Sequence, residues 1–219
     1  MRTVILTFDD AVISQYENVV PLLKKLGFGA TFFICRFTDE WREKNERFLM
    51  TGEQIREIDS AGFEIANHTW NHYDLRKLSE PEIEKEIKRM NDFLAENGIK
   101  APVSFAYPGG PYAGNAVGVL KRNGFICARS VRDEAFHPAV DDPMNLPSFS
   151  IRGEDPSVFR NAVSAADEEN PVILVFHGVP EYVHPWVDQK FPLFQESMQF
   201  LKENGFRVCS LRDWFMKQA

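Results

Sequence analysis

Short apolar runs that end abruptly in polar side chains recur along this chain. The first run, Val4-Ile5-Leu6, leads into the adjacent carboxylates Asp9 and Asp10. A run this short and rich in β-branched residues is typical of a buried strand. Burying carboxylates is costly unless they are paired with a charge or bind a metal. We therefore expect a buried strand whose end carries carboxylates with a chemical task.

Apolar runs alternate with longer amphipathic segments across the chain. The patterns predict strands at residues 4–6, 30–35, 64–67, 103–107, 125–131, 172–176 and 206–209. They predict helices at residues 19–26, 53–61, 79–97, 115–123, 157–169 and 192–204, and a last one at the C-terminal end. Residues 39–47 are expected to form a solvated loop or a short helix, and residues 133–147 a long loop. Alternating strands and helices imply right-handed βαβ units, so we expect an α/β fold with a mainly parallel sheet, built as one domain over residues 1–219.

Two histidines, His68 and His72, follow the short strand expected at residues 64–67. At a spacing of four residues, their side chains would share one face of a helical turn. Two imidazoles and one carboxylate are the ligand set of a catalytic divalent metal, which leaves the second carboxylate free to act as a base. Each motif alone is weak, because Asp-Asp pairs are mostly loop or capping residues and spaced histidines are often surface or core residues. Together, at the ends of two strands, they indicate an α/β active site.

Composition excludes several classes of protein. A net charge of −7 argues against nucleic acid and anionic membranes as partners. No apolar segment is long enough to span a bilayer, and no signal peptide precedes the first strand, so a cytoplasmic protein is expected if Met1 is the natural start. The cysteines Cys35, Cys127 and Cys209 are scattered among apolar runs and are expected to be buried thiols in a reducing compartment.

Four motifs occur in an order that resembles a known family. They are Thr7-Phe8-Asp9-Asp10, the segment from Asn67 to His72, Phe105-Ala106-Tyr107-Pro108-Gly109-Gly110, and Val175-Phe176-His177. The chain is thus similar to the polysaccharide deacetylases, the NodB-homology proteins of carbohydrate esterase family 4, and to a subgroup with Phe-Ala-Tyr-Pro at the third motif. The resemblance implies an irregular (β/α) barrel, a deformed TIM barrel of seven or so parallel strands. It also implies metal-dependent removal of N- or O-acetyl groups from sugars.

The resemblance assigns roles to the residues of these motifs. Asp10, His68 and His72 would hold the metal, and Asp9 would be the general base that takes a proton from the attacking water. His177 would be the general acid, although a core histidine bonded to a backbone carbonyl is the alternative. Zinc is the first expectation for these ligands, with cobalt, nickel and iron left open.

The chain departs from the family pattern near the expected base. Ala106 stands where many members carry an arginine that braces the base, and the family's Asp-x-Trp motif is absent. Arg129 and Arg132 follow the next strand and are candidates for the missing brace, with surface charges as the alternative. Because Arg132 lies further into the loop, where Asp133 is a nearby partner, we prefer Arg129.

Two further segments are candidates for substrate contacts. Pro108 and Gly109 lie in the third motif, where the Gly109 N–H could serve as an oxyanion donor, although a simple tight turn explains the same residues. Trp186 lies in the loop after His177, together with Tyr182 and His184. Its ring could stack on a sugar, although a surface loop would have the same composition.

We expect a metal-dependent hydrolase that removes an acyl group from an N-acetylated sugar or glycan. One alternative keeps the chemistry on a small amide or ureide, as in an allantoinase-like enzyme, or on a carrier-linked formamido sugar. Another class is an inactive carbohydrate-binding protein, which the missing arginine and tryptophan favour and the presence of Asp9 and His177 opposes. Nothing in the sequence predicts the oligomeric state.

Overall fold

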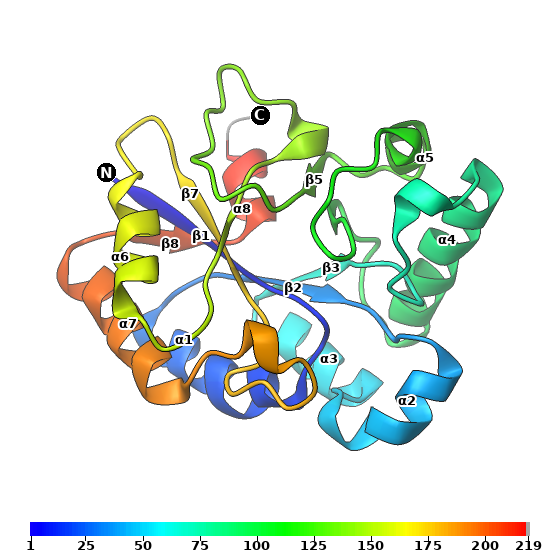
Figure 1. The fold of residues 1–219 in the computed structure, drawn as a ribbon, viewed down its shortest axis with the longest axis horizontal. Coiled ribbons are helices and arrows are strands. Elements are labelled where there is room, and N and C mark those ends of the chain that lie inside the picture. Colours follow the sequence, from blue (N-terminus) through cyan, green and yellow to red (C-terminus); the bar gives the residue numbers. More distant parts are fainter. Residues whose placement is uncertain (218–219) are drawn as a thin grey trace.

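A curved sheet of parallel strands forms the centre of the fold in the computed structural model, which describes residues 1–217 of the chain (Figure 1). The strands are β1 (Thr3–Phe8), β2 (Thr31–Ile34), β3 (Glu64–Asn67), β4 (Ser104–Ala106), β5 (Cys127–Arg129), β6 (Phe149–Ser150), β7 (Val172–Phe176) and β8 (Arg207–Cys209). Their order is β5-β4-β3-β2-β1-β7-β6, with β8 beside β1, and every pairing between them is parallel. The α/β class and the deformed parallel barrel expected from the sequence are confirmed, with eight strands in the described part of the chain.

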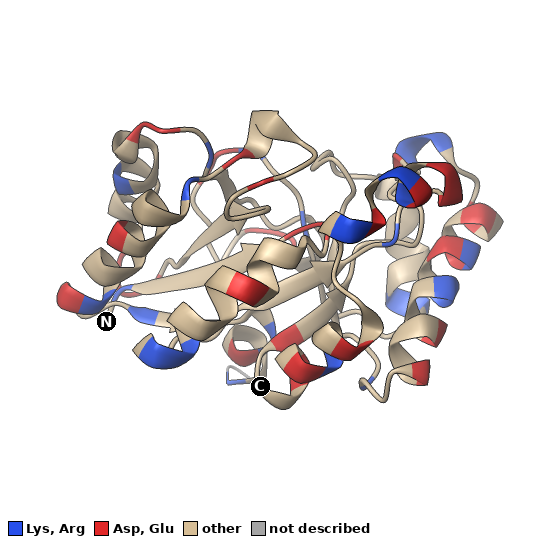
Figure 2. Ribbon diagram, turned by 90° about the horizontal axis from the view of Figure 1, so that it is seen from below, with Lys and Arg blue, Asp and Glu red and all other residues tan. Residues whose placement is uncertain are grey.

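Helices flank this sheet, and the last of them lies at one end of the barrel (Figure 1). They are α1 (Val20–Leu26), α2 (Asp39–Asn45), α3 (Gly52–Ser60), α4 (Glu80–Glu96), α5 (Val117–Arg122), α6 (Pro156–Ser164), α7 (Phe191–Glu203) and α8 (Leu211–Met216). A capping box starts α4, since the backbone N–H of Ser79 donates to the Glu82 carboxylate at 2.7 Å. Residues 39–45 form the short helix α2, one of the two outcomes expected for this charged segment. Figure 2 shows acidic and basic residues interspersed along the outer helices, as in the pair of Lys88 and Asp92 at 2.7 Å.

Strand β1 is the central strand. It pairs with β7 along most of its length, whereas its other edge is shared by β8 at Thr3–Ile5 and by β2 at Thr7 and Phe8. The two edges of the sheet also approach one another. The Leu146 N–H donates to the Ala128 carbonyl and the Leu146 carbonyl accepts from the Ser130 N–H, so Leu146 lies beside β5. Shortly after Leu146 in the chain, β6 begins and pairs with β7. The segment between β5 and β7 therefore continues the barrel wall.

Alternating side chains of the strands build two different cores. Val4, Leu6 and Phe8 pack outward in the large cluster beneath the helices. The alternate residue Ile5 packs with Phe33 and with others of a second cluster inside the barrel, which contains Ala66, Ala106, Cys127, Ile173, Cys209, Leu211 and Trp214. Because Leu211 and Trp214 come from α8, this helix closes the end of the barrel where the strands begin.

A buried carboxylate fastens α8 to the barrel. Glu64 accepts hydrogen bonds from Thr31 Oγ1 at 2.7 Å, from Ser104 Oγ at 2.6 Å and from the backbone N–H of Arg212 at 2.8 Å. Leu211 N–H in turn donates to Thr31 Oγ1 at 2.9 Å. These bonds satisfy the free N–H groups at the start of α8, so the closed end of the barrel has a polar layer below its apolar core.

Two further sequence expectations concern the cysteines and the membrane. All three cysteines are buried and free. In the described part of the chain, every helix is too short or too polar to cross a bilayer.

Candidate active site

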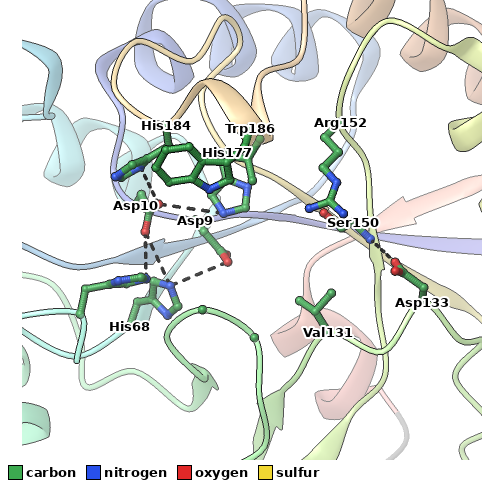
Figure 3. A pocket seen from close by; sticks show the side chains of 14 residues that line it. Asp9, Asp10, His68, Val131, Asp133, Ser150, Arg152, His177, His184 and Trp186 are labelled. Carbon is green, nitrogen blue, oxygen red and sulfur yellow. Dashed lines mark hydrogen bonds and ion pairs between the residues drawn. The ribbon is translucent and has the colours of Figure 1, made fainter. Parts of the chain in front are cut away.

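Strand alternation aims four polar side chains at the open end of the barrel. Side chains an even number of residues apart on a strand point to the same face. Asp9, His68, Arg129 and His177 lie two or four residues beyond the inward-facing Ile5, Ala66, Cys127 and Ile173. Each therefore continues the inner face of its strand beyond the apolar core. Asp9, His68 and His177 line one pocket (Figure 3). Arg129 does not line it but contacts Asp9.

Asp10 reaches the same site through an unusual backbone turn. By alternation it would face outward, but Asp10 and Ala11 have φ values of 75° and 55°. Left-handed backbone at non-glycine residues costs about 1–3 kcal/mol each and persists where the surroundings impose it. Gln15 helps to impose it, since its Nε2 donates to the Asp9 carbonyl at 2.5 Å and to the His177 carbonyl at 3.2 Å.

His68 and His72 converge on a tight turn, not on a helix. The structure contradicts the expected helical face, because residues 68–72 have no helical structure and Thr69 and His72 have φ values of 64° and 59°. Side chains hold this turn: Asn67 Oδ1 accepts from the Thr69 N–H at 2.7 Å, and Thr69 Oγ1 accepts from the His72 N–H at 3.1 Å. The two imidazole rings end 4.8 Å apart.

Asn71, the residue before His72, anchors the turn to α4. Its backbone N–H and its Nδ2 donate to the two carboxylate oxygens of buried Glu86, at 2.7 Å and 2.6 Å. A carboxylate that accepts two such bonds fixes both the main chain and the side chain of Asn71. The position of His72 therefore depends on a residue of a neighbouring helix.

Asp10, His68 and His72 form a candidate metal centre. Oδ1 of Asp10 lies 3.7 Å from Nε2 of His68 and 3.5 Å from Nε2 of His72, and the three ligand atoms lie within 4.8 Å of one another. Ligand atoms at about 2.0–2.2 Å from a tetrahedral zinc ion would be roughly 3.4 Å apart, so this cluster has nearly the required size.

The protonation of these groups also suits a metal. Nδ1 of His68 lies 2.8 Å from the Ala106 carbonyl, to which it can donate, and this leaves the Nε2 lone pair facing the cluster. Burial lowers the pKa of His68 to about 4, so the ring is neutral. Burial alone would raise the pKa of Asp10, but the surrounding histidines, His72 and His184 first, hold it well below its usual range. Neutral imidazoles and an ionised carboxylate are the forms that bind metals.

Asp9 is held by Arg129. Nη2 of Arg129 donates to Oδ1 of Asp9 at 2.7 Å and to Oδ2 at 2.5 Å, and the arginine is fully buried. Its guanidinium also lies over the Phe33 ring, 5.2 Å from the centroid. In the register of β4 and β5, Arg129 is the direct partner of Ala106. In the family pattern the arginine stands at the position of Ala106. In this chain the arginine stands on the neighbouring strand, directly beside the small Ala106 side chain.

Arg132, the other candidate for this contact, lies elsewhere. Its guanidinium is 3.2 Å from Glu134 and 3.8 Å from Asp141, and it donates to the Asn145 carbonyl at 2.8 Å. These contacts tie together the long loop after β5. Asp133, the partner suggested by the sequence, instead accepts from the Ser150 N–H at 2.9 Å.

A pocket of about 240 Å³ opens above Asp9 and the candidate metal centre (Figure 3). Its lining residues are Asp9, Asp10, His68, His72, Gly109, Gly110, Val131, Asp133, Ser150, Arg152, His177, His184, Trp186 and Val187. Gly109 has a φ of 70° at the third position of a turn closed by the Gly110 N–H and the Tyr107 carbonyl at 2.9 Å, and Pro108 occupies the second position. Pro108, also expected as a substrate contact, is buried and does not line the pocket, whereas Gly109 and Gly110 do.

Three histidines beyond the expected set of ligands deserve comparison. His177 lies in the pocket with Nε2 4.0 Å from Oδ2 of Asp10. His184, which the sequence suggested only as part of an aromatic loop, has Nδ1 3.6 Å from the same oxygen. Burial would lower the pKa of His184, but Asp10 raises it above its usual value. The remaining histidine, His137, is exposed and outside the pocket, so four of the five histidines of the chain line it.

The other side of the pocket was also not predicted. Asp133, Ser150 and Arg152 lie opposite the histidines. Trp186, which the sequence did suggest as a substrate contact, lies near the histidines and is 68% exposed. Ser150 and Arg152 come from β6 and the residues after it, a strand too short to give a periodic signal in the sequence. The only hint in the sequence is Arg152, a charged residue that follows the loop predicted at residues 133–147.

Comparison with known proteins identifies the family. The sequence model described as polysaccharide deacetylase matches residues 1–128. A poly-β-1,6-N-acetyl-D-glucosamine N-deacetylase of Staphylococcus aureus is 30% identical over 152 residues, which are 64% of this chain and 52% of that protein. The chain therefore spans about half the length of the curated relatives it matches.

Solved structures share the fold at lower identity. PdaA of Bacillus subtilis, a family 4 carbohydrate esterase, has a TM-score of 0.68 at 18% identity and covers 99% of this chain and 82% of that one. A carbohydrate esterase family 4 pseudoenzyme of Bacillus anthracis has a TM-score of 0.66 at 20% identity, over 96% of this chain and 64% of that one. Identities this low show the fold alone. The family match, however, covers more than half of the sequence and includes Asp9, Asp10, His68 and His72, and the chain therefore belongs to the polysaccharide deacetylase family.

Proposed function

We propose that this protein is a metal-dependent N-deacetylase acting on an N-acetylated sugar or glycan. One observation carries the proposal: two adjacent carboxylates have different partners. Asp10 faces His68 and His72, whereas Asp9 is held by Arg129. A protein that only binds sugar has no need for this division, but hydrolysis of an amide needs both a metal ligand and a base.

Asp10, His68 and His72 would hold the metal, with zinc the first choice and cobalt, nickel or iron as the other candidates. The size of the cluster, the free Nε2 atoms and the ionised carboxylate support this assignment. A divalent ion bound there would polarise the acyl oxygen and lower the pKa of water in the pocket. Three protein ligands leave open positions for substrate and water, as catalytic sites require.

Asp9 would take the proton of the attacking water. It is buried beside the cluster, with Oδ2 3.8 Å from Nε2 of His68, so it lies close to where that water would sit. Arg129 keeps the carboxylate in one orientation. A base must lie within hydrogen-bond reach of the proton it removes, and the position of Asp9 beside the cluster supports this.

His177 would give a proton to the leaving amine nitrogen. It follows β7, lines the pocket and lies near Oδ2 of Asp10, whereas His68 and His72 lie near Oδ1. The Gly109 N–H, on the pocket-facing side of the Pro108 turn, would donate to the acyl oxygen as negative charge develops. The exposed Trp186 ring would offer an apolar surface to a sugar face.

A hydrolysis screen that measures release of acetate, formate and allantoate tests this function. We would assay oligomers of β-1,6- and β-1,4-linked N-acetylglucosamine, with allantoin and a formamido sugar as representatives of the alternative substrates, and measure the metal content of each preparation. The similarity to a poly-β-1,6-N-acetyl-D-glucosamine N-deacetylase puts the β-1,6 oligomers first. Acetate from the oligomers supports the proposal, whereas hydrolysis of allantoin alone would assign the site to a small amide.

Two variants test the division between the carboxylates. Asp9→Asn should retain the metal and lose about 10²–10⁴-fold in turnover, because the base is removed. Asp10→Asn should lose metal affinity as well, since a ligand is neutralised. Metal content after dialysis and acetate release are measured on both. Equal loss of metal from the two variants would contradict the proposed roles, and no turnover by the wild-type protein on any substrate would favour an inactive sugar-binding protein.

A further inference from the structure

His184 approaches the side of Asp10 that faces away from the candidate metal ligands. His68 and His72 lie near Oδ1 of Asp10, at 3.7 Å and 3.5 Å, whereas Nδ1 of His184 lies 3.6 Å from Oδ2. Figure 3 shows His184 and His68 on opposite sides of the Asp10 carboxylate. The two oxygens of this carboxylate therefore have separate neighbours.

The loop that carries His184 is built around a buried carboxylate. Oε1 of Glu181 accepts from three consecutive backbone N–H groups, those of Tyr182 at 3.0 Å, Val183 at 2.9 Å and His184 at 3.2 Å. Oε2 accepts from the Gly178 N–H at 2.8 Å. A carboxylate in such a ring of N–H groups makes a loop rigid, so the backbone of His184 has a fixed position.

The start of the same loop is equally constrained. Ser14 Oγ accepts from the Val179 N–H at 2.8 Å, and Asn18 Nδ2 donates to the Val179 carbonyl at 2.9 Å. A side chain at Gly178 would place its Cβ 2.7 Å from the Cα of Glu181, so only glycine fits this turn. The start of the loop is thus tied to the segment that follows Asp10 in the chain.

Aromatic rings fix the orientation of the His184 side chain. Its ring stacks on Trp41 with centroids 5.5 Å apart and an interplanar angle of 23°. Phe37 and Trp186 pack against it at 5.6 Å and 5.2 Å. This packing, together with the rigid loop, keeps Nδ1 directed at Asp10.

We propose that His184 is a positioning residue that donates an Nδ1–H hydrogen bond to Oδ2 of Asp10 and so presents Oδ1 to the metal. The inference rests on the proposed metal site. A separation of 3.6 Å is too long for a hydrogen bond, but a small rotation of the carboxylate closes it, and such bonds commonly tighten when the site is filled. Cys35 Sγ donates to Oδ1 of Asp10 at 3.6 Å, so His184 would supply the corresponding donor on the Oδ2 side.

Metal affinity tests the proposal without any need for substrate. Dissociation constants for Zn²⁺ are measured by competition with a chromophoric chelator for the wild-type protein and for three variants. His184→Phe keeps an aromatic ring for Trp41 and removes the donor. His184→Asn loses the ring and keeps an amide N–H close to the position of Nδ1. His137→Phe is the matched control, at the exposed histidine outside the pocket.

His184→Phe should weaken Zn²⁺ binding by about 10–100-fold, the usual cost of losing a partner of a metal ligand. His184→Asn should bind nearly as tightly as the wild-type protein, and His137→Phe should bind equally well. Unchanged affinity in His184→Phe would overturn the proposal while leaving the metal site intact. Equal losses in the Phe and Asn variants would also overturn it, since the ring would then matter and not the donor. Failure of the wild-type protein to bind Zn²⁺ would overturn the metal site and the inference together.

Discussion

Replacing Arg129 by methionine tests how the barrel tolerates its buried ion pair. Arg129 is fully buried, and Asp9, its only carboxylate partner in the described part of the chain, is buried as well. Methionine keeps an unbranched apolar chain in contact with Phe33 but removes the guanidinium. The Asp9 carboxylate would then be a buried charge that has lost its counter-ion, with only the cluster of histidines nearby.

The expected cost is about 3–5 kcal/mol of unfolding free energy, the range measured when one partner of a buried pair is removed. In a protein of this size, each kcal/mol lowers Tm by about 2–4 °C, so Tm should fall by about 6–20 °C. Asp9→Asn combined with Arg129→Met should recover part of this loss, because the double variant no longer buries an unpaired charge. The two single losses should therefore sum to more than the loss of the double variant.

The assay is urea unfolding of the four proteins of this cycle in the presence of a chelator, so that metal binding does not contribute. Arg132→Met is the matched control, because that arginine pairs with Glu134 and Asp141 near the surface and should cost no more than about 1 kcal/mol. A loss below about 1 kcal/mol for Arg129→Met, or additive losses in the cycle, would refute the account of a tightly coupled pair.

Two other predictions concern the ends of the barrel. Burial raises the pKa of Glu64 despite the bonds from Ser104, Arg212 and Thr31, so the folded state binds more protons than the unfolded state, and stability should fall as pH rises above the usual glutamate pKa of about 4.5. The unfolding free energy of Glu64→Gln, measured with urea, should fall less over this range. The same pH dependence in the variant and the wild-type protein would contradict the assigned cause. At the open end, Gly110→Ala places a Cβ 2.9 Å from that of Val131 at a φ of 94° and should cost about 1–3 kcal/mol in the same assay. Gly27→Ala, also at positive φ but with no neighbour within 4 Å, separates backbone strain from the clash, and equal losses would exclude a contribution from Val131.

Strand alternation explains why much of this site could be predicted from the sequence. A polar residue at the end of a buried apolar run lies at the edge of the sheet, and parallel strands bring their carboxyl ends to the same edge. This reasoning applies to Asp9, His68 and His177, which continue the inner faces of β1, β3 and β7. It also applies to Arg129, whose distance from Asp9 in the sequence is large but whose strand ends at the same edge.

Features that depend on tertiary contacts were beyond such reasoning. The direction of Asp10 follows from a left-handed turn held by Gln15, and no periodicity indicates such a turn. The helical spacing of His68 and His72 suggested the wrong local structure, because Asn67 and Thr69 cap a turn there instead. His184 lies near Asp10 only because Glu181 shapes its loop and aromatic rings from α2 and its surroundings pack against it. Isolated hydrogen-bonding residues of this kind leave no pattern in a single sequence.

Acetate release measured against added metal is the most direct test of the central claim, that Asp10, His68 and His72 hold a divalent ion that deacetylation requires. Chelator-treated protein is titrated with Zn²⁺, and acetate released from an N-acetylglucosamine oligomer is followed at each step. We predict no release at the start, a linear rise to a plateau at one equivalent of Zn²⁺, and no rise in the Asp10→Asn variant at the same metal concentrations. Full release by the chelator-treated protein, or an equal rise in the Asp10→Asn variant, would contradict the account.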